Sequence, residues 1–134
     1  MINPEIQKTN QLGHFSNPDI ECVLEYIKRV WNEKRFSEIA VYLDDHYIDH
    51  SMPYAVVQNQ QGLIIYLNEL AEVVSHQTEI VALTILGELV VCHVRISVSE
   101  LLCVDDSCKV TEVFYGYRMF RMNGNKIAEH WEIL

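Results

Sequence analysis

The hydrophobic period of this chain changes once, near its middle, and that change limits the folds open to it. From residue 17 to about residue 74, apolar residues recur every three or four positions, which is typical of helices with one buried face. From residue 77 onward, β-branched and aromatic residues form four runs separated by turn residues, which predicts strands. Helices followed by consecutive strands indicate an α+β fold, with the helices packed on one face of an antiparallel sheet.

Three helices are predicted in the first half of the chain. The first begins at Asn17, which can cap it, and Pro18 suits the first helical position. A short second helix covers the region from Phe36 to Leu43, and a third follows Gly62. The apolar residues at helical spacing are Ile20, Val23, Leu24, Ile27, Val30 and Trp31 in the first helix, Phe36, Ile39, Ala40 and Leu43 in the second, and Leu63, Tyr66, Leu67, Leu70, Val73 and Val74 in the third.

Turn signals divide the second half into four strands. The predicted turns are Gly87-Glu88, Asp105-Asp106 and Asn123-Gly124, and the last is the strongest hairpin signal of the three. With 134 residues the chain is long enough for one domain with a real core. We expect that domain to span 17–134, with 1–16 as a mobile N-terminal arm, because the arm shows no sustained period.

Composition excludes several classes of function. The net charge of −9 disfavours binding to a nucleic-acid backbone, which needs a basic surface. No apolar run is long enough for a membrane span or a secretory signal, so we expect a cytoplasmic protein that binds no membrane. Four cysteines fit that compartment as reduced thiols, although Cys103 and Cys108 flank a predicted turn and could meet across it.

The last hairpin predicts which side chains share a face of the sheet. If Asn123-Gly124 forms a two-residue turn, Arg118 faces Glu129 on one side of the sheet. On the other side, Tyr117 faces His130. The same count pairs Phe120 with Ile127, Gly116 with Trp131, Met119 with Ala128 and Tyr115 with Glu132. A slip of one residue would change every pair, so this register is a hypothesis.

Phenol, imidazole and carboxylate groups converge on the predicted face that holds Tyr117, His130 and Glu132. A carboxylate in apolar surroundings tends to have a raised pKa, which suits general acid–base catalysis. A nearby Tyr or His can donate a hydrogen bond to a developing oxyanion. A salt-bridged sheet edge near the chain end is the structural alternative, and the residues alone leave both interpretations open.

Two stretches of the chain resemble the SnoaL-like branch of the nuclear transport factor 2-like superfamily. The first comprises the helix that ends at Trp31, the YIDHSMP segment at 47–53 and the glycine of the third helix, Gly62. The second is the ending NGNKIAEHWE at 123–132, which is the more specific motif. The resemblance covers about residues 18–134, with the same order of elements.

This resemblance implies a cone-shaped domain, in which a curved antiparallel sheet wraps about three N-terminal helices and encloses an apolar pocket. It further implies a small apolar ligand, no cofactor, and a homodimer formed through the outer face of the sheet. In the polyketide cyclases of this branch, an acid near the end of the last strand is the acid/base. Glu132 occupies that position, as glutamate in place of aspartate, and Tyr117 stands where the cyclases carry their partner histidine.

Further candidates for the pocket come from the helices and from the YIDHSMP segment. Similar proteins point a polar side chain from this segment into the cavity, which makes His50 a candidate catalytic residue. A hydrogen bond from His50 to a loop carbonyl is the structural alternative. We expect pocket walls at Trp31, Tyr47, Tyr66, Tyr115 and Met119, although residues with this spacing are also typical of a plain core.

A metal site is not predicted. His46 and His50 are four residues apart with aspartates nearby, a spacing that holds a metal on a helix. The segment is predicted to be extended, which separates the two imidazoles.

The sequence therefore allows three functions for one pocket domain. The first is a cofactor-independent cyclase, isomerase or dehydratase that acts on a small apolar carbonyl or polyketide-like compound, with Glu132 moving the proton and Tyr117, His130 or His50 assisting. The second is a module that binds a small ligand without changing it. The third is a dimeric interaction domain that works through the outer face of its sheet.

Overall fold

The computed structural model describes residues 17–101 and 110–134. The expected N-terminal arm and the cysteine pair at Cys103 and Cys108 lie outside these residues, as does the turn at Asp105-Asp106. No helix in the described part of the chain is long and apolar enough to cross a membrane.

The helices occupy the first half of the chain. They are α2 (Pro18–Tyr26), which continues as the π-helical turn η1 (Ile27–Asn32), then the short pieces η2 (Phe36–Glu38), α3 (Ile39–Tyr42) and η3 (Ala55–Val57), and finally α4 (Gln60–Val73). The Asn17 side chain accepts hydrogen bonds from the backbone N–H groups of Asp19 and Ile20, as expected for a helix cap. The helical period of the sequence is thus confirmed.

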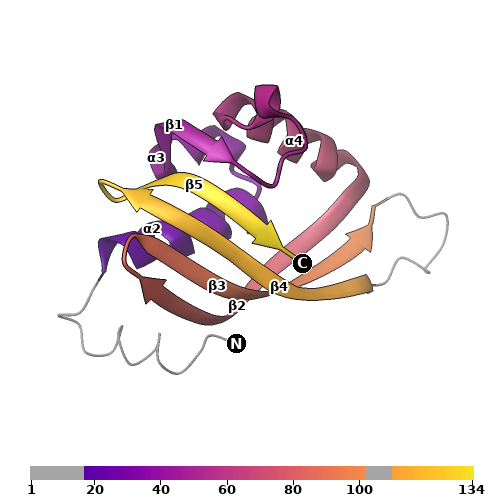
Figure 1. The fold of residues 1–134 in the computed structure, drawn as a ribbon. Coiled ribbons are helices and arrows are strands. Elements are labelled where there is room, and N and C mark those ends of the chain that lie inside the picture. Colours follow the sequence, from indigo (N-terminus) through magenta and orange to yellow (C-terminus); the bar gives the residue numbers. More distant parts are fainter. Residues whose placement is uncertain (1–16, 102–109) are drawn as a thin grey trace.

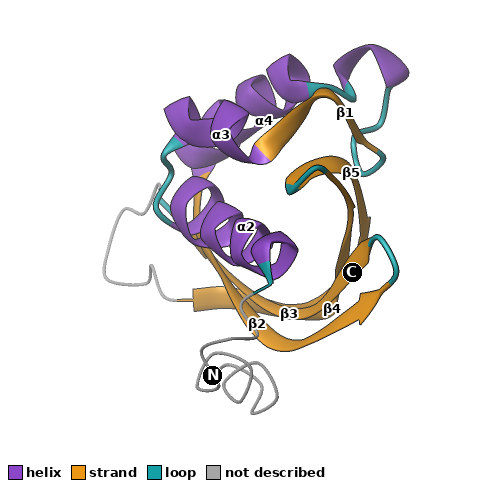
Figure 2. Cartoon of the chain, turned by 90° about the vertical axis from the view of Figure 1, so that its left-hand side faces the viewer, coloured by secondary structure: helices purple, strands orange, loops and turns teal. Residues whose placement is uncertain are grey.

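Five strands form one curved sheet that does not close. They are β1 (Leu43–Asp49), β2 (Val74–Leu86), β3 (Leu89–Glu100), β4 (Val110–Asn123) and β5 (Lys126–Ile133), in the spatial order β1-β5-β4-β3-β2. Figure 1 shows the four long strands side by side. In Figure 2 the sheet bends around α2, with α3 and α4 on its open side. The α+β class with a curved sheet is confirmed.

The sheet is mixed, whereas the sequence predicted an antiparallel one. β1 pairs in parallel with β5, so that Asp49 lies beside His130. The sequence analysis missed β1 because it assigned Leu43 to the second helix and predicted the segment from Tyr47 only as extended chain, not as a strand of the sheet. The core fills the space between α2, η1 and the concave side of the sheet, and its largest fully buried side chains include Tyr26, Phe120 and Leu63.

The register predicted for the last hairpin is wrong. Gly124 and Asn125, both at positive φ, form the turn, so Asn123 pairs with Lys126. A bulge then follows, because Met122 pairs with Ile127 and Arg121 pairs with Glu129. The observed partners farther along are Phe120 with His130, Met119 with Trp131, Arg118 with Glu132 and Tyr117 with Ile133.

The bulge has a physical cause in the side chains that it buries. Ile127 and Ala128 are adjacent in sequence, yet both are buried, which a regular strand with alternating faces would not allow. After the extra residue, His130 and Glu132 share the concave side with Arg118. Counting residues outward from a turn cannot reveal such an insertion.

Two glycines are required by close backbone contacts. A Cβ on Gly62 would lie 1.9 Å from the carbonyl oxygen of Val57, so only glycine lets α4 pass this close to η3. A Cβ on Gly116 would lie 2.2 Å from the carbonyl oxygen of Ile133. The first of these contacts fixes the start of the helix that forms one wall of the pocket.

Candidate functional site: an apolar cavity with one ion pair

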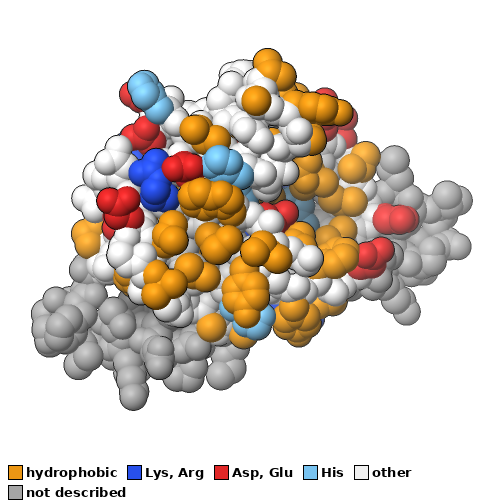
Figure 3. Space-filling view, viewed as in Figure 1, with side chains coloured by type: hydrophobic (Ala, Val, Ile, Leu, Met, Phe, Trp, Pro, Cys, Tyr) orange, Lys and Arg blue, Asp and Glu red, His pale blue; other side chains and the backbone are white. Residues whose placement is uncertain are grey.

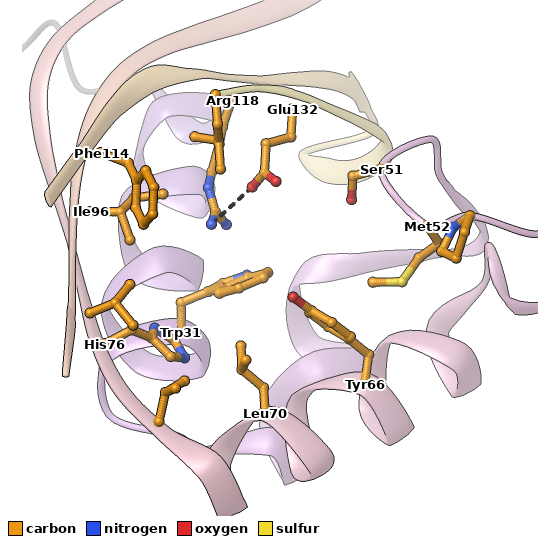
Figure 4. Close-up of a pocket in the computed structure, with 14 residues that line it drawn as sticks. Trp31, Ser51, Met52, Tyr66, Leu70, His76, Ile96, Phe114, Arg118 and Glu132 are labelled. Carbon is orange, nitrogen blue, oxygen red and sulfur yellow. Dashed lines mark ion pairs between the residues drawn. The ribbon is translucent and has the colours of Figure 1, made fainter. Parts of the chain in front are cut away.

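A cavity of about 270 Å³ lies between η1, α4 and the concave side of the sheet. Figure 4 shows side chains from several elements pointing into it. The lining residues are Trp31, Ser51, Met52, Pro53, Tyr66, Leu70, Val74, His76, Ile96, Val98, Phe114, Arg118, Glu132 and Leu134. Since liquid water occupies about 30 Å³ per molecule, this space suits a small organic ligand that is largely apolar.

One ion pair interrupts the apolar wall. Nη2 of Arg118 lies 3.1 Å from Oε2 of Glu132, and the dashed line in Figure 4 marks this contact. The Arg118 guanidinium also lies over the indole of Trp31, with Cζ 4.0 Å from the ring centroid. The Arg118 side chain is 4% exposed and that of Glu132 is 24% exposed. Glu132 is therefore the more accessible partner, and its carboxylate reaches the cavity.

Tyr66 and His76 add polar groups to the cavity wall. Burial raises the pKa of the Tyr66 phenol, and the negative charge of Glu132 raises it further. Burial lowers the pKa of His76, and the positive charges of Arg118 and Lys34 act in the same direction. Near neutral pH the cavity thus offers an un-ionised phenol and an uncharged imidazole as well as the ion pair.

A second polar cluster, centred on Asp49, is buried beside the cavity. Nδ1 of His130 lies 3.0 Å from Oδ1 of Asp49, while the Tyr47 hydroxyl donates to Oδ2 over 2.6 Å. The backbone N–H of Ser51 donates to the same carboxylate over 3.0 Å. Burial alone would raise the pKa of Asp49, but the hydrogen bond and charge of His130, with Ser51 and Tyr47, lower it to about 2. This cluster therefore holds a carboxylate ionised inside the protein.

The structure brings some of the predicted site residues together. Glu132, Trp31 and Tyr66 line the cavity. His130 and Tyr47 belong to the Asp49 cluster, and they are not among the cavity-lining residues. A role for any of these residues in binding or catalysis stays a prediction.

Four other predicted residues lie away from the cavity, on the convex side of the sheet. Tyr115, Tyr117 and Met119 alternate with Arg118 along β4, so the wrong hairpin register placed them on the wrong face. Tyr117 stacks on His93 instead, with ring centroids 4.9 Å apart. His50 does not enter the cavity either: its ring stacks on Trp131, with centroids 4.8 Å apart, and its Nε2 lies 2.6 Å from Oε2 of Glu129.

The sequence analysis missed three polar residues of the cavity. Arg118 was predicted to face Glu129, and only the bulge reveals that it pairs with Glu132. His76 stands at the junction of the helical and strand patterns, where neither period assigns it to a face. Ser51 follows the Asp49 cluster in the turn after β1, and a parallel strand was not predicted there. The nearest signal was the YIDHSMP segment, from which His50 was chosen in place of Ser51.

Hydrophobic side chains gather over β4 and β5 on the convex side of the sheet, as Figure 3 shows. Tyr115 is 59% exposed and Ile133 is 58% exposed, and Val113 and Tyr117 are also exposed. His93 lies on this side too, opposite the buried Cys92 and Val94. An exposed apolar surface of this kind is typical of sites that bind another protein.

In the part of the chain that the structure describes, no group of three or more His, Cys, Asp or Glu side chains is placed to hold a metal ion. His46 and His50 stand on and just after β1, where the backbone is extended or turning.

No protein-family model matches the chain, and no curated protein matches it in sequence. Solved structures do match its fold. A SnoaL-like polyketide cyclase from Agrobacterium tumefaciens C58 has 14% identity and a TM-score of 0.68, over 88% of this chain and 91% of that one. TsrD from Streptomyces laurentii has 16% identity and a TM-score of 0.67, over 88% and 89% of the two chains. An LEH-like epoxide hydrolase from M. tuberculosis has 11% identity and a TM-score of 0.66, over 86% and 76%.

The chain therefore shares the fold of a SnoaL-like polyketide cyclase, as the resemblance seen in the sequence implied. These identities are low, so the reactions of the neighbours do not transfer to this chain.

Proposed function

We propose that this protein binds a small, largely apolar carbonyl compound in the cavity and moves a proton next to its carbonyl group without a cofactor. The observation that carries the proposal is the Glu132–Arg118 pair in the wall of an otherwise apolar cavity. Cyclisation, isomerisation and dehydration all use such a proton transfer. The neighbours described as polyketide cyclases are consistent with this reaction class.

The roles of the cavity residues follow from their chemistry. The carboxylate of Glu132, which is paired with Arg118, removes a proton from the carbon next to the carbonyl, and the electron pair of that C–H bond moves toward oxygen. The enolate oxygen is stabilised by the Arg118 guanidinium or by the Tyr66 hydroxyl. Glu132 then returns the proton to the product. We assign His130 the role of positioning Asp49, because its imidazole lies within hydrogen-bond distance of that carboxylate and does not line the cavity.

Exchange of α-protons tests this proposal without knowledge of the natural substrate. The protein is incubated with 2-tetralone in D₂O, and deuterium next to the carbonyl is measured by mass spectrometry. We expect the wild type to accelerate exchange over buffer, and Glu132→Gln to lose about 100-fold or more of that acceleration. Glu129→Gln is the matched control, since Glu129 lies on the same strand and pairs with Arg121 on the convex side.

Two outcomes would contradict the proposal. Undiminished exchange in a folded Glu132→Gln variant would show that Glu132 is not the base. If ketones bind to the wild type but exchange no faster than in buffer, the protein is a binding module that leaves its ligand unchanged. Circular dichroism of each variant separates loss of chemistry from loss of fold.

We also propose that the protein forms a homodimer through the convex side of its sheet. The exposed side chains of Val113, Tyr115, Tyr117 and Ile133 support this, because they leave apolar surface in water when the chain is alone. Sedimentation equilibrium should give twice the chain mass for the wild type, and the mass of one chain for Tyr117→Asp. A monomeric wild type at high concentration would exclude the dimer.

The cytoplasmic location stays a prediction from composition.

A further inference from the structure

Arg118 differs from every other arginine of the chain in its surroundings. The whole residue is 3% exposed, whereas the other arginines are half-buried or exposed, namely Arg29, Arg35, Arg95 and Arg121. A buried guanidinium keeps its charge, because arginine does not lose its proton in proteins. The interior must therefore supply negative charge and hydrogen-bond acceptors for it.

The described residues supply few of these acceptors. Nη2 of Arg118 is paired with Glu132. Its Nε and Nη1 have no hydrogen-bond partner among the residues that the structure describes. Both nitrogens are shielded from water, so bulk solvent does not satisfy them either. Buried donors are nearly always paired, and leaving charged donors unpaired is costly. The Trp31 ring under the guanidinium offers attraction to the charge but no hydrogen-bond acceptor.

The position of Arg118 indicates what supplies the missing acceptors. Its guanidinium lines the cavity, so a bound molecule comes within reach of the unpaired donors after a turn of the Arg118 side chain. Glu132 is about a quarter exposed and is therefore better screened by water than the guanidinium is.

We propose that the ligand of this cavity is a small organic acid, whose carboxylate binds Arg118 beside Glu132 while its apolar body lies among Trp31, Ile96 and Phe114. This inference rests on the proposed function for the location of the ligand, and it adds the chemical class of that ligand. A monoanion is expected because Arg118 is the one cationic side chain among the described lining residues and already shares its charge with Glu132. A phosphate dianion would need further cationic groups.

Matched pairs of acid and amide test the inference. Isothermal titration calorimetry compares 3-phenylpropanoate with 3-phenylpropanamide, and phenylacetate with phenylacetamide, which differ mainly in the charge of the head group. We expect the wild type to bind at least one acid about tenfold or more tighter than its amide. Arg118→Met should lose this preference. Arg121→Gln, on the same strand but on the convex side, should keep it.

The inference is overturned if no acid binds the wild type more tightly than its amide, or if Arg118→Met keeps the preference. Should Arg118→Met fail to fold, Glu132→Gln gives the deciding result. Removing the neighbouring negative charge should tighten binding of the acid and leave binding of the amide unchanged, and weaker binding of the acid would overturn the inference.

The exchange of α-protons separates this inference from the proposed function, because 2-tetralone carries no charge. Acid preference without exchange would refute the proposed reaction and leave the anionic ligand in place. Exchange that depends on Glu132, without any acid preference, would overturn the inference and leave the proposed reaction in place.

Discussion

Acid should weaken the folded state of this protein through one buried carboxylate, that of Asp49. Its pKa is lowered from an ordinary 3.8 to about 2, because the hydrogen bonds and charge around it outweigh the effect of burial. Each unit of pKa difference between folded and unfolded chains corresponds to about 1.4 kcal/mol. The ionised Asp49 therefore contributes about 2.5 kcal/mol to the free energy of unfolding.

The direction of the pH dependence follows from the lowered pKa. Above about pH 4 the carboxylate is ionised in both the folded and the unfolded chain, so its whole contribution is present. As the pH falls from about 4 to about 2, the unfolded chain takes up the proton first, and the contribution is lost. The contribution thus disappears within this window as the solution becomes more acidic.

Urea unfolding followed by circular dichroism measures the effect. We expect the wild type to lose about 2 kcal/mol more between about pH 5 and about pH 2.5 than the variant Asp49→Asn, which has no carboxylate to titrate at this position. Asp45→Asn is the control, because Asp45 lies on the same strand and is exposed. It should follow the wild type. The reasoning is refuted if Asp49→Asn loses as much stability with acid as the wild type does.

Three further changes test the packing that positions the cavity. Gly62→Ala should lower the urea midpoint by more than a surface substitution does, since its Cβ would overlap the carbonyl oxygen of Val57. Asn17→Ala should cost about 1 kcal/mol in urea unfolding, because two N–H groups of α2 lose their acceptor. Glu132→Gln should lower the free energy of unfolding by about 1–3 kcal/mol and so lower the melting temperature, since the buried Arg118 loses its charged partner. An unchanged melting temperature would mean that Arg118 gains nothing from that charge.

The helices could be predicted from sequence because their buried residues recur every three or four positions, a spacing that strands and loops do not show. The long strands could be predicted for the same reason, and adjacent strands in the chain proved to be neighbours in the sheet. β1 could not, because its partner β5 lies far along the chain and a parallel pair needs no turn signal between its strands. Missing β1 also hid the Asp49 cluster, which exists only where β1 meets β5.

The faces of residues 130–133 in β5 were predicted correctly, but the faces of Ile127 and of β4 were not. His130 and Glu132 do lie on the concave side, and Trp131 and Ile133 do lie on the convex side. The error came from the bulge near Ala128, whose only sign in the sequence is the adjacent apolar pair Ile127-Ala128, and such a pair also occurs in regular strands. Arg118 was therefore assigned to the convex side, where a charged residue on a strand is usually found.

The corrected register gives each face of the hairpin one ion pair of the same kind. On the convex side Nε of Arg121 lies 2.6 Å from Glu129, and on the concave side Nη2 of Arg118 lies 3.1 Å from Glu132. The shorter pair is the weaker one for stability, because water and salt screen it and exposed pairs contribute about 1 kcal/mol or less. In the cavity little water surrounds the guanidinium, so the local dielectric constant is low and charges interact more strongly. The Arg118–Glu132 pair therefore also acts strongly on a molecule that enters the cavity. The Glu129 and Glu132 variants match in strand, residue type and arginine partner, but Glu129 also contacts His50, so their difference measures the effect of the cavity together with the loss of that contact.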